Sequence, residues 1–263
     1  MSITLMADGN ARFAVLNLVE KLDISPEIFL KNFNEYKDQY LKSLLEVYEK
    51  NAVWCGLFGK ALLTNNRGSD LMIFVYNYTN KQREHHEVIE KVITRRGQEI
   101  IDMLKPYANL YILGPDSEKK KWSSIFQELE PLNRNAELDE NRVIFGVGYE
   151  YNTSEGMDST VKYLRNMDIF LRATQLRLSG MFFPALKDAL FLCLDSSLYL
   201  YDPSHLAEEI QKYHTIDEEH DELNIYSSAV YNAWIKSNQK NNSLKLLCTF
   251  RSYPSRTLRI NPI

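Results

Sequence analysis

The sequence has few cysteines, no long apolar run and no marked excess of charge. Its three cysteines are Cys55, Cys193 and Cys248, without a Cys-x-x-Cys pair, which argues against a disulfide framework and against a zinc site. No apolar stretch approaches the roughly 20 residues that a membrane-spanning helix requires. A net charge of −4 gives no reason to expect nucleic acid as a partner.

The N-terminus lacks the basic flank and the long apolar stretch of a secretory signal, so we expect a cytoplasmic protein. We find no internal repeat and no low-complexity linker that would divide the chain. With 263 residues, 44% of them apolar, it is long enough for one large domain over residues 1–263.

Short apolar runs alternate with amphipathic helical patterns along the chain. This alternation predicts an α/β fold: a single domain with a mostly parallel twisted sheet of about six strands, flanked by helices. A long helical region should break near Ser25-Pro26, because serine is a good N-cap and proline suits the first helical position. Strands are expected at 3–7, 71–76, 110–113, 142–148, 169–171, 191–194 and 246–250, and helices at 11–53, 81–104, 159–166, 205–212 and 225–237.

The helix after the break has apolar positions that suit one face packed on a core. Core packing is the preferred role of its aromatic side chains, and lining an apolar tunnel is the alternative. These positions are Ile28, Phe29, Phe33, Tyr36, Tyr40, Leu44, Leu45 and Val47.

Asp8-Gly9-Asn10 follows the first apolar run and precedes a helical pattern beginning at Ala11 and Arg12. A strand, tight turn and helix in this order form an anion site, because glycine allows close approach and the first helical N–H groups point at the ligand. An acid beside a bound phosphate suggests an intervening Mg²⁺, held by Asp8. The same three residues are also a common turn, and spacing alone does not decide between the two.

A second motif follows the apolar run Ile169-Phe170-Leu171. Arg172, Arg177 and Ser179 come in close succession after it, and guanidinium and hydroxyl groups are good donors to phosphate oxygens. Surface ion pairing is the alternative role for these arginines.

A third motif carries Asn80, Arg83, Glu87 and Val88 after the expected strand 71–76. Asn80 also suits a helix N-cap, a role that does not exclude catalysis.

The string Asp-Gly-Asn-x-Arg-Phe-Ala after an N-terminal strand, together with Asp-x-x-x-Arg leading to Arg-x-Ser, resembles the cis-prenyltransferases, the undecaprenyl diphosphate synthase family. The third motif matches that family only in part. The resemblance covers roughly residues 3–202 and implies a cis-prenyltransferase-like fold, a homodimer and Mg²⁺ as cofactor. It implies that Asp8 and Asn80 are catalytic and that Asp8 binds the metal. It further implies substrate binding by Gly9, Asn10, Ala11, Arg12, Lys21, Arg83, Arg172, Arg177 and Ser179.

Several departures from the family pattern identify a divergent member. The loop between Arg172 and Arg177 is one residue shorter than usual, and the acid that follows the family's Arg-x-Ser aligns near Leu190. Asp188 could replace that acid only with a shift. About 20 extra residues, by alignment, separate the first and third motifs.

The resemblance implies an enzyme of isoprenoid biosynthesis, a prenyl diphosphate synthase that couples an allylic diphosphate to isopentenyl diphosphate or a related acceptor. A terpene cyclase using one prenyl diphosphate is the second hypothesis, which the missing acid and the 16 Tyr, 12 Phe and 3 Trp allow. A non-catalytic partner subunit is the third, and the presence of Asp8 argues against it. An apolar product also allows loose association with membranes.

Overall fold

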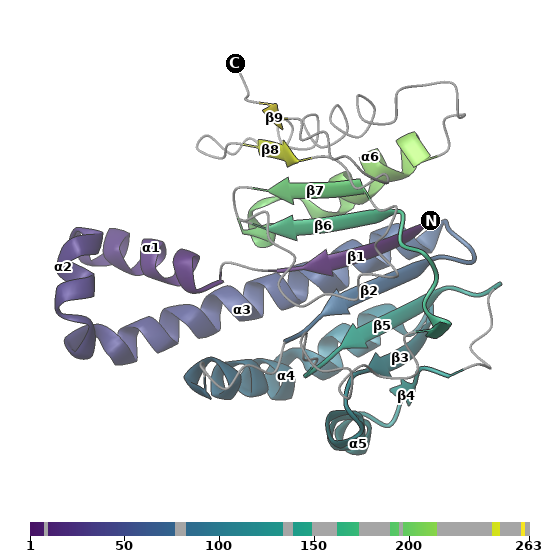
Figure 1. Ribbon diagram of the computed structural model, residues 1–263, viewed down its shortest axis with the longest axis horizontal. Helices are drawn as coiled ribbons and strands as arrows, with labels where there is room; N and C mark the ends of the chain where they lie inside the picture. Colours follow the sequence, from purple (N-terminus) through teal and green to yellow (C-terminus); the bar gives the residue numbers. More distant parts are fainter. Residues whose placement is uncertain are drawn as a thin grey trace.

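The computed structural model describes residues 1–7, 10–76, 83–133, 139–148, 162–173, 190–194, 197–214, 244–247 and 259–260. The described strands form one sheet (Figure 1). They are β1 (Ser2–Met6), β2 (Asp70–Phe74), β3 (Asn109–Leu113), β4 (Glu130–Pro131), β5 (Arg142–Gly146), β6 (Ile169–Ala173), β7 (Leu190–Leu194), β8 (Leu244–Leu247) and β9 (Arg259–Ile260).

The strand order in the sheet is β4-β3-β5-β2-β1-β6-β7-β8-β9. Neighbouring strands from β4 to β7 pair in parallel. At one edge, β8 pairs antiparallel with β7, and β9 pairs antiparallel with β8. The prediction of an α/β fold with a mostly parallel sheet of about six strands is therefore confirmed. The six strands of five residues are the ones expected from the apolar runs, each within two residues of its predicted bounds.

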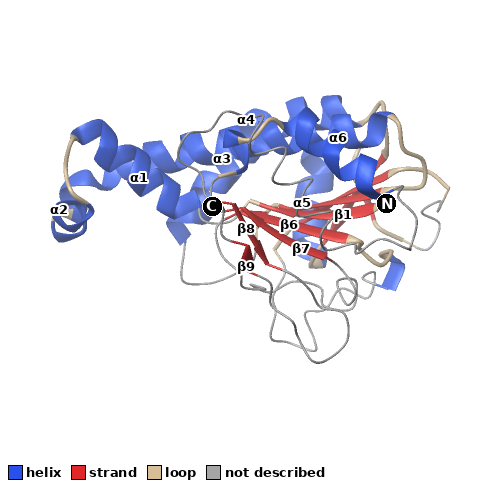
Figure 2. Ribbon diagram, turned by 90° about the horizontal axis from the view of Figure 1, so that it is seen from above, coloured by secondary structure: helices blue, strands red, loops and turns tan. Residues whose placement is uncertain are grey.

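Helices cover one face of this sheet, where α3, α4 and α6 lie together (Figure 2). The helices are α1 (Asn10–Leu22), α2 (Pro26–Lys31), α3 (Phe33–Thr64), α4 (Arg83–Leu104), α5 (Asp116–Ile125) and α6 (Pro203–His214), with a short 3-10 turn η3 (Leu198–Leu200). None of the described helices combines the length and apolarity needed to cross a membrane. The predicted helix 225–237 lies outside the described residues, as do residues 159–161. Over residues 162–166 the predicted helix is wrong, because only a short 3-10 turn at residues 162–163 forms there.

Both faces of the sheet are buried, as a parallel sheet requires. Side chains alternate along each strand, so Leu5 and Ile73 join the core under α3 and α4, while Met6 and Phe74 join a second core on the opposite face. The strands are therefore continuous apolar runs, and not the alternating apolar and polar residues of a strand with one solvent-exposed face.

The long helical region breaks where the sequence predicts. Ser25 Oγ accepts a hydrogen bond from the Ile28 backbone N–H at 3.3 Å, and Pro26 is the first residue of α2. The predicted end near Val53 is wrong, because α3 continues to Thr64. Gly59 would disfavour an exposed helix, but a Cβ there would lie 2.6 Å from Leu71 Cδ2, so the glycine lets α3 pack closely on the sheet.

Figure 1 shows α1, α2 and the first half of α3 extending beyond the sheet as an arm. The arm has its own apolar core, in which Phe29, Tyr40 and Leu44 are buried as predicted. Ile28 is a wrong prediction, because it is 47% exposed on the outer side of α2.

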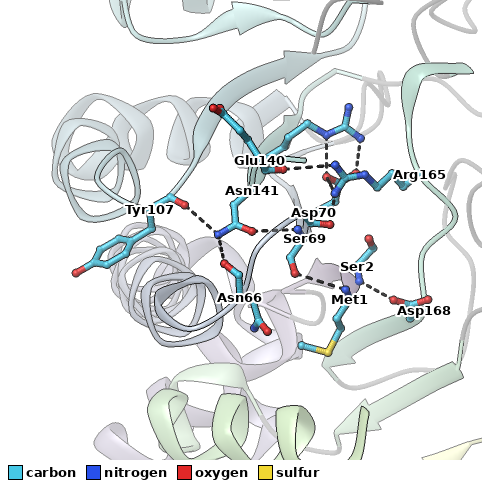
Figure 3. A network of polar contacts seen from close by, with 12 residues as sticks. Met1, Ser2, Asn66, Ser69, Asp70, Tyr107, Glu140, Asn141, Arg165 and Asp168 are labelled. Atoms are coloured by element: carbon cyan, nitrogen blue, oxygen red, sulfur yellow. Dashed lines mark hydrogen bonds and ion pairs between the residues drawn. The ribbon is translucent and has the colours of Figure 1, made fainter. Parts of the chain in front are cut away.

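The amino-terminal end of the sheet holds a buried ion network (Figure 3). Asp70 and Arg142 are register partners in β2 and β5, and the Arg142 guanidinium donates to both Asp70 carboxylate oxygens, at 2.8 and 2.5 Å. Arg165 lies 3.0 Å from the same carboxylate and donates to the Gly68 carbonyl. The Asp70 and Arg142 side chains are at most 1% exposed, so each depends on the other for its solvation.

Asn141 connects this network to the helices (Figure 3). Its side-chain amide donates to the Leu63 carbonyl at 3.2 Å and the Asn66 carbonyl at 2.6 Å, at the end of α3. It also donates to the Tyr107 carbonyl at 3.2 Å, just after α4. Its oxygen accepts from the Ser69 N–H at 3.0 Å. One half-buried side chain thus satisfies carbonyls that two helix ends leave without intrahelical partners.

Candidate functional site

The carboxyl end of β1 leads into α1 through three residues. Ala7 and Asn10 are described, whereas Asp8 and Gly9 lie outside the described residues. Asn10 is 5% exposed, and its side-chain amide donates to the Ala7 carbonyl at 2.7 Å. The predicted strand and helix are therefore present in order on either side of Asp8-Gly9, and Asn10 ties the helix to the strand.

The side chain of Asn51, in α3, contacts this junction. Its amide nitrogen donates to Asn10 Oδ1 at 2.6 Å. Its oxygen accepts from Ser197 Oγ at 2.9 Å and from the Tyr199 backbone N–H at 3.1 Å. The sequence analysis did not select Asn51, although an asparagine among the apolar positions of a long helix could have drawn attention to it.

Arg172 lies beside the same junction. β6 is a parallel neighbour of β1, and Arg172 is the register partner of Met6, the last residue of β1. The side chain is 2% exposed and, by alternation, shares its face with Phe170. The described members of the first two motifs, Asn10 and Arg172, therefore lie near the carboxyl ends of adjacent strands, where open α/β sheets bind ligands.

Asp168 is at the other end of β6 from Arg172. Its carboxylate accepts from the Ser2 backbone N–H at 2.7 Å, and its own N–H donates to the Ser2 carbonyl at 2.9 Å. Of the Asp-x-x-x-Arg pair, the acid thus fastens β6 to the start of β1, while the arginine lies near the opposite end of β6, on the face of Phe170.

An apolar cavity lies between α3, α4 and the sheet. It has an empty volume of about 890 Å³, which includes space open to solvent. Ala7 and Asn51 line it near β1, while Ile112 and Phe126 line it near β3 and α5. The cavity therefore runs across three strand spacings, about 14 Å in all.

The wall near α5 is closed by aromatic rings. Trp122 and Phe126 stack with ring centroids 6.4 Å apart. A Cβ on Gly97 of α4 would lie 2.5 Å from Phe126 Cζ, so glycine is required for this ring to reach α4. Residue size at these three positions sets how far the cavity extends.

The described lining of the cavity carries no charged side chain. Cys55 is part of it, and burial raises the pKa of the Cys55 thiol to about 12. The thiol stays protonated at neutral pH, so the cavity wall is neutral.

A polar cluster borders the cavity beyond Trp122. The Trp122 indole N–H donates to the Tyr76 hydroxyl at 2.7 Å, and that hydroxyl donates to the Glu118 carboxylate. Burial, followed by the hydrogen bond to Glu118, raises the pKa of Tyr76. Gly148, with φ at +56°, lies against the Glu118 side chain. Sequence reasoning missed this cluster, since its members come from three separate segments.

The remaining predicted site residues lie at varied positions. Ala11 and Arg12 are in the first turn of α1, with Arg12 exposed. Lys21 is in the last turn of α1, about 16 Å along the helix axis from Asn10, so the structure does not bring the two together. Arg83 is the first residue of α4. Asn80, Arg177, Ser179 and Asp188 lie outside the described residues.

A resident metal would need ligands near this junction. Within the described ranges no group of three His, Cys, Asp or Glu side chains is placed to hold an ion. Mg²⁺ commonly takes only one or two carboxylates and completes its shell with water and substrate phosphates. A single acid directly after Ala7 therefore fits magnesium better than it fits a metal held by protein ligands alone.

Comparisons with known proteins place this geometry in context. No protein-family model matches the chain, and no curated protein matches it significantly in sequence. Among solved structures, a probable undecaprenyl diphosphate synthase from Campylobacter jejuni is similar, with 13% sequence identity and a TM-score of 0.43. The match covers 82% of this chain and 95% of that one. This similarity assigns neither an activity nor a substrate.

Proposed function

We propose that the protein is a magnesium-dependent prenyltransferase that ionises an allylic diphosphate and couples it to isopentenyl diphosphate or a related acceptor. One observation carries this proposal. The neutral, apolar cavity reaches Ala7 and Asn51 at the end of β1, where the chain continues into Asp8-Gly9 and the first turn of α1. A prenyl diphosphate has the same division into a hydrocarbon tail and an anionic head.

The head group of the allylic substrate would lie at the start of α1. Backbone N–H groups of Gly9, Asn10 and Ala11 would donate to its phosphate oxygens, with Arg12 adding charge. The positive end of the helix dipole favours an anion at this position. Lys21 would bind substrate only if the substrate, or a second copy of the chain, reaches the last turn of α1.

The second diphosphate would lie on the β6 side of the junction. Arg172, Arg177 and Ser179 would hold it through charge-assisted hydrogen bonds. Asn80 and Arg83, which follow β2 along the same edge of the sheet, would lie near the reacting atoms. This arrangement brings the two substrates together over the ends of β1 and β6.

Mg²⁺ would be held by Asp8 together with substrate phosphates and water, and would neutralise charge on the departing diphosphate. The apolar side chains that line the cavity would offer no polar partner to water beside the allylic cation. The cavity also presents no thiolate to trap the cation, since the Cys55 pKa is about 12. The faces of Tyr48 and Trp122 in its wall can stabilise positive charge.

The test is turnover by purified protein with Mg²⁺ and dimethylallyl, geranyl or farnesyl diphosphate, with and without isopentenyl diphosphate, read by mass spectrometry. We expect a longer diphosphate that requires isopentenyl diphosphate and disappears in Asp8→Ala. Asp38→Ala, an exposed acid on α3, is the matched control and should keep wild-type activity.

A terpene cyclase is the second candidate, and the aromatic rings in the cavity wall favour it. Its signature would be a hydrocarbon or alcohol formed from one diphosphate alone. Absence of turnover in every combination would instead support a partner subunit. The homodimer implied by the resemblance, the cytoplasmic location expected from the N-terminus and the loose membrane association of an apolar product stay predictions.

A further inference from the structure

Asn51 places an amide in a wall that is otherwise apolar. It is 1% exposed on α3, between the cavity and the start of α1. A buried amide without partners would destabilise the fold by about 1–3 kcal/mol. The hydrogen bonds of this side chain therefore explain how the fold accommodates it.

The chemistry of its neighbours fixes the direction of these hydrogen bonds. The Tyr199 backbone N–H can only donate, so Asn51 must present its oxygen to it. The Ala7 carbonyl can only accept, so Asn10 must present its nitrogen to Ala7 and its oxygen to Asn51. A single orientation of both amides satisfies all four contacts, including the one from Ser197 Oγ.

This chain of hydrogen bonds joins four segments: the end of β1, the first turn of α1, the middle of α3 and the segment after β7. The Asn10 side chain contributes both of its ends to this chain, since its nitrogen donates to Ala7 and its oxygen accepts from Asn51. The amide of Asn51 thus sets where the first turn of α1 lies relative to the carboxyl ends of β1 and β7.

We propose that Asn51 is a positioning residue for the diphosphate end of the site, acting through Asn10. This inference rests on the proposed function for its ligand, but the placement of α1 can be tested independently. Asn51 holds Asn10 and the Ser197–Tyr199 segment on one buried side chain, and so keeps the first turn of α1 in place beside the cavity.

Two substitutions separate the parts of this role. Asn51→Asp keeps an oxygen for Ser197 and Tyr199 but loses the donor to Asn10. Asn51→Leu loses both. Ser43→Ala is the matched control, because Ser43 Oγ donates to the Ala14 carbonyl at 2.9 Å and so links the same two helices two turns away.

The readouts are amide hydrogen exchange at the start of α1 and the Kd for inorganic diphosphate with Mg²⁺, measured by calorimetry. We expect Asn51→Asp to raise exchange there and to weaken binding by about tenfold, which is a typical coupling between contacting residues. Ser43→Ala should lower the unfolding temperature without either change. Asn10→Ala combined with Asn51→Asp should bind no more weakly than the weaker single variant.

Wild-type exchange and affinity in Asn51→Asp, or additive losses in the double variant, would overturn the inference. If Asn51→Leu fails to fold, the near-isosteric Asp variant still decides it. If the wild-type protein binds no diphosphate, the proposed function fails, while the exchange experiment still tests the positioning by Asn51.

Discussion

The two ends of the sheet solve opposite problems. At the amino-terminal end, Asp70 and Arg142 form a buried ion pair, and Arg165 adds a second cation beside the same carboxylate. At the carboxyl end, the described residues include the hydrogen-bonded side chains of Asn10 and Asn51, the buried Arg172 and an apolar cavity. The first arrangement is complete without a ligand, whereas the second has the elements of a site for an anion with an apolar tail. Substitutions at one end should therefore affect stability, and substitutions at the other should affect binding.

The largest effect on stability should come from Asp70→Asn. The substitution leaves two guanidinium groups without their carboxylate, one of them in a fully buried pair, and should lower the free energy of unfolding by about 3–5 kcal/mol. Denaturant unfolding measures this. Glu99→Gln, which breaks the exposed pair with Arg96, is the control and should stay close to wild type. A similar loss in both variants would contradict the special role of the amino-terminal end.

Arg172→Met should affect diphosphate affinity more than stability. We expect diphosphate affinity to fall by about 10- to 100-fold, the loss of one or two charge-assisted hydrogen bonds. The stability loss should be smaller than that of Asp70→Asn, because an apolar side chain of similar length replaces a buried cation. Calorimetric titration and denaturant unfolding of the same sample separate the two effects. Unchanged affinity with a large stability loss would make Arg172 part of the fold rather than of the site.

The pH dependence of stability at Cys55 tests whether the cavity excludes a charged thiolate. Burial raises the pKa of this thiol from its ordinary value of 9.0 to about 12. The folded state thus keeps the proton between pH 9 and 12 while the unfolded state loses it. The stabilising contribution is complete below pH 9 and is lost with rising pH at about 1.4 kcal/mol per unit. Urea unfolding at pH 8 and pH 10 should show this slope in wild type minus Cys55→Val. Equal slopes in the two proteins would mean that the cavity tolerates a thiolate.

Ser25→Ala should have the smallest effect, because it lies in the arm, away from both ends of the sheet. Loss of the N-cap hydrogen bond to the Ile28 N–H should lower stability by about 1 kcal/mol. Thermal unfolding measures the change, and diphosphate affinity should be that of wild type. An affinity loss would mean that the arm takes part in binding.

The sequence predicts the strands and the first two motifs because these are local patterns. Apolar runs identified β1, β2 and β6, and the motif residues follow directly on their strands. The pairing of Asp70 with Arg142 depends on register between strands 72 residues apart, which no local pattern encodes. The extension of α3 through Gly59 depends likewise on the close approach of Leu71. Asn51 was missed for the same reason, since its partners come from two distant segments, the start of α1 and Ser197–Tyr199.

The central claim is that one ligand places its tail in the cavity and its head at the ends of β1 and β6. Val92→Phe tests it directly, because Val92 of α4 lines the cavity and is remote in sequence from the motifs. Calorimetry should compare farnesyl diphosphate with inorganic diphosphate in wild type and variant, with Mg²⁺. We predict that Val92→Phe weakens farnesyl diphosphate by about tenfold or more and leaves inorganic diphosphate unchanged, because the new ring fills tail space only. Equal affinities of wild type and variant for farnesyl diphosphate, or equal losses for both ligands, would contradict the account.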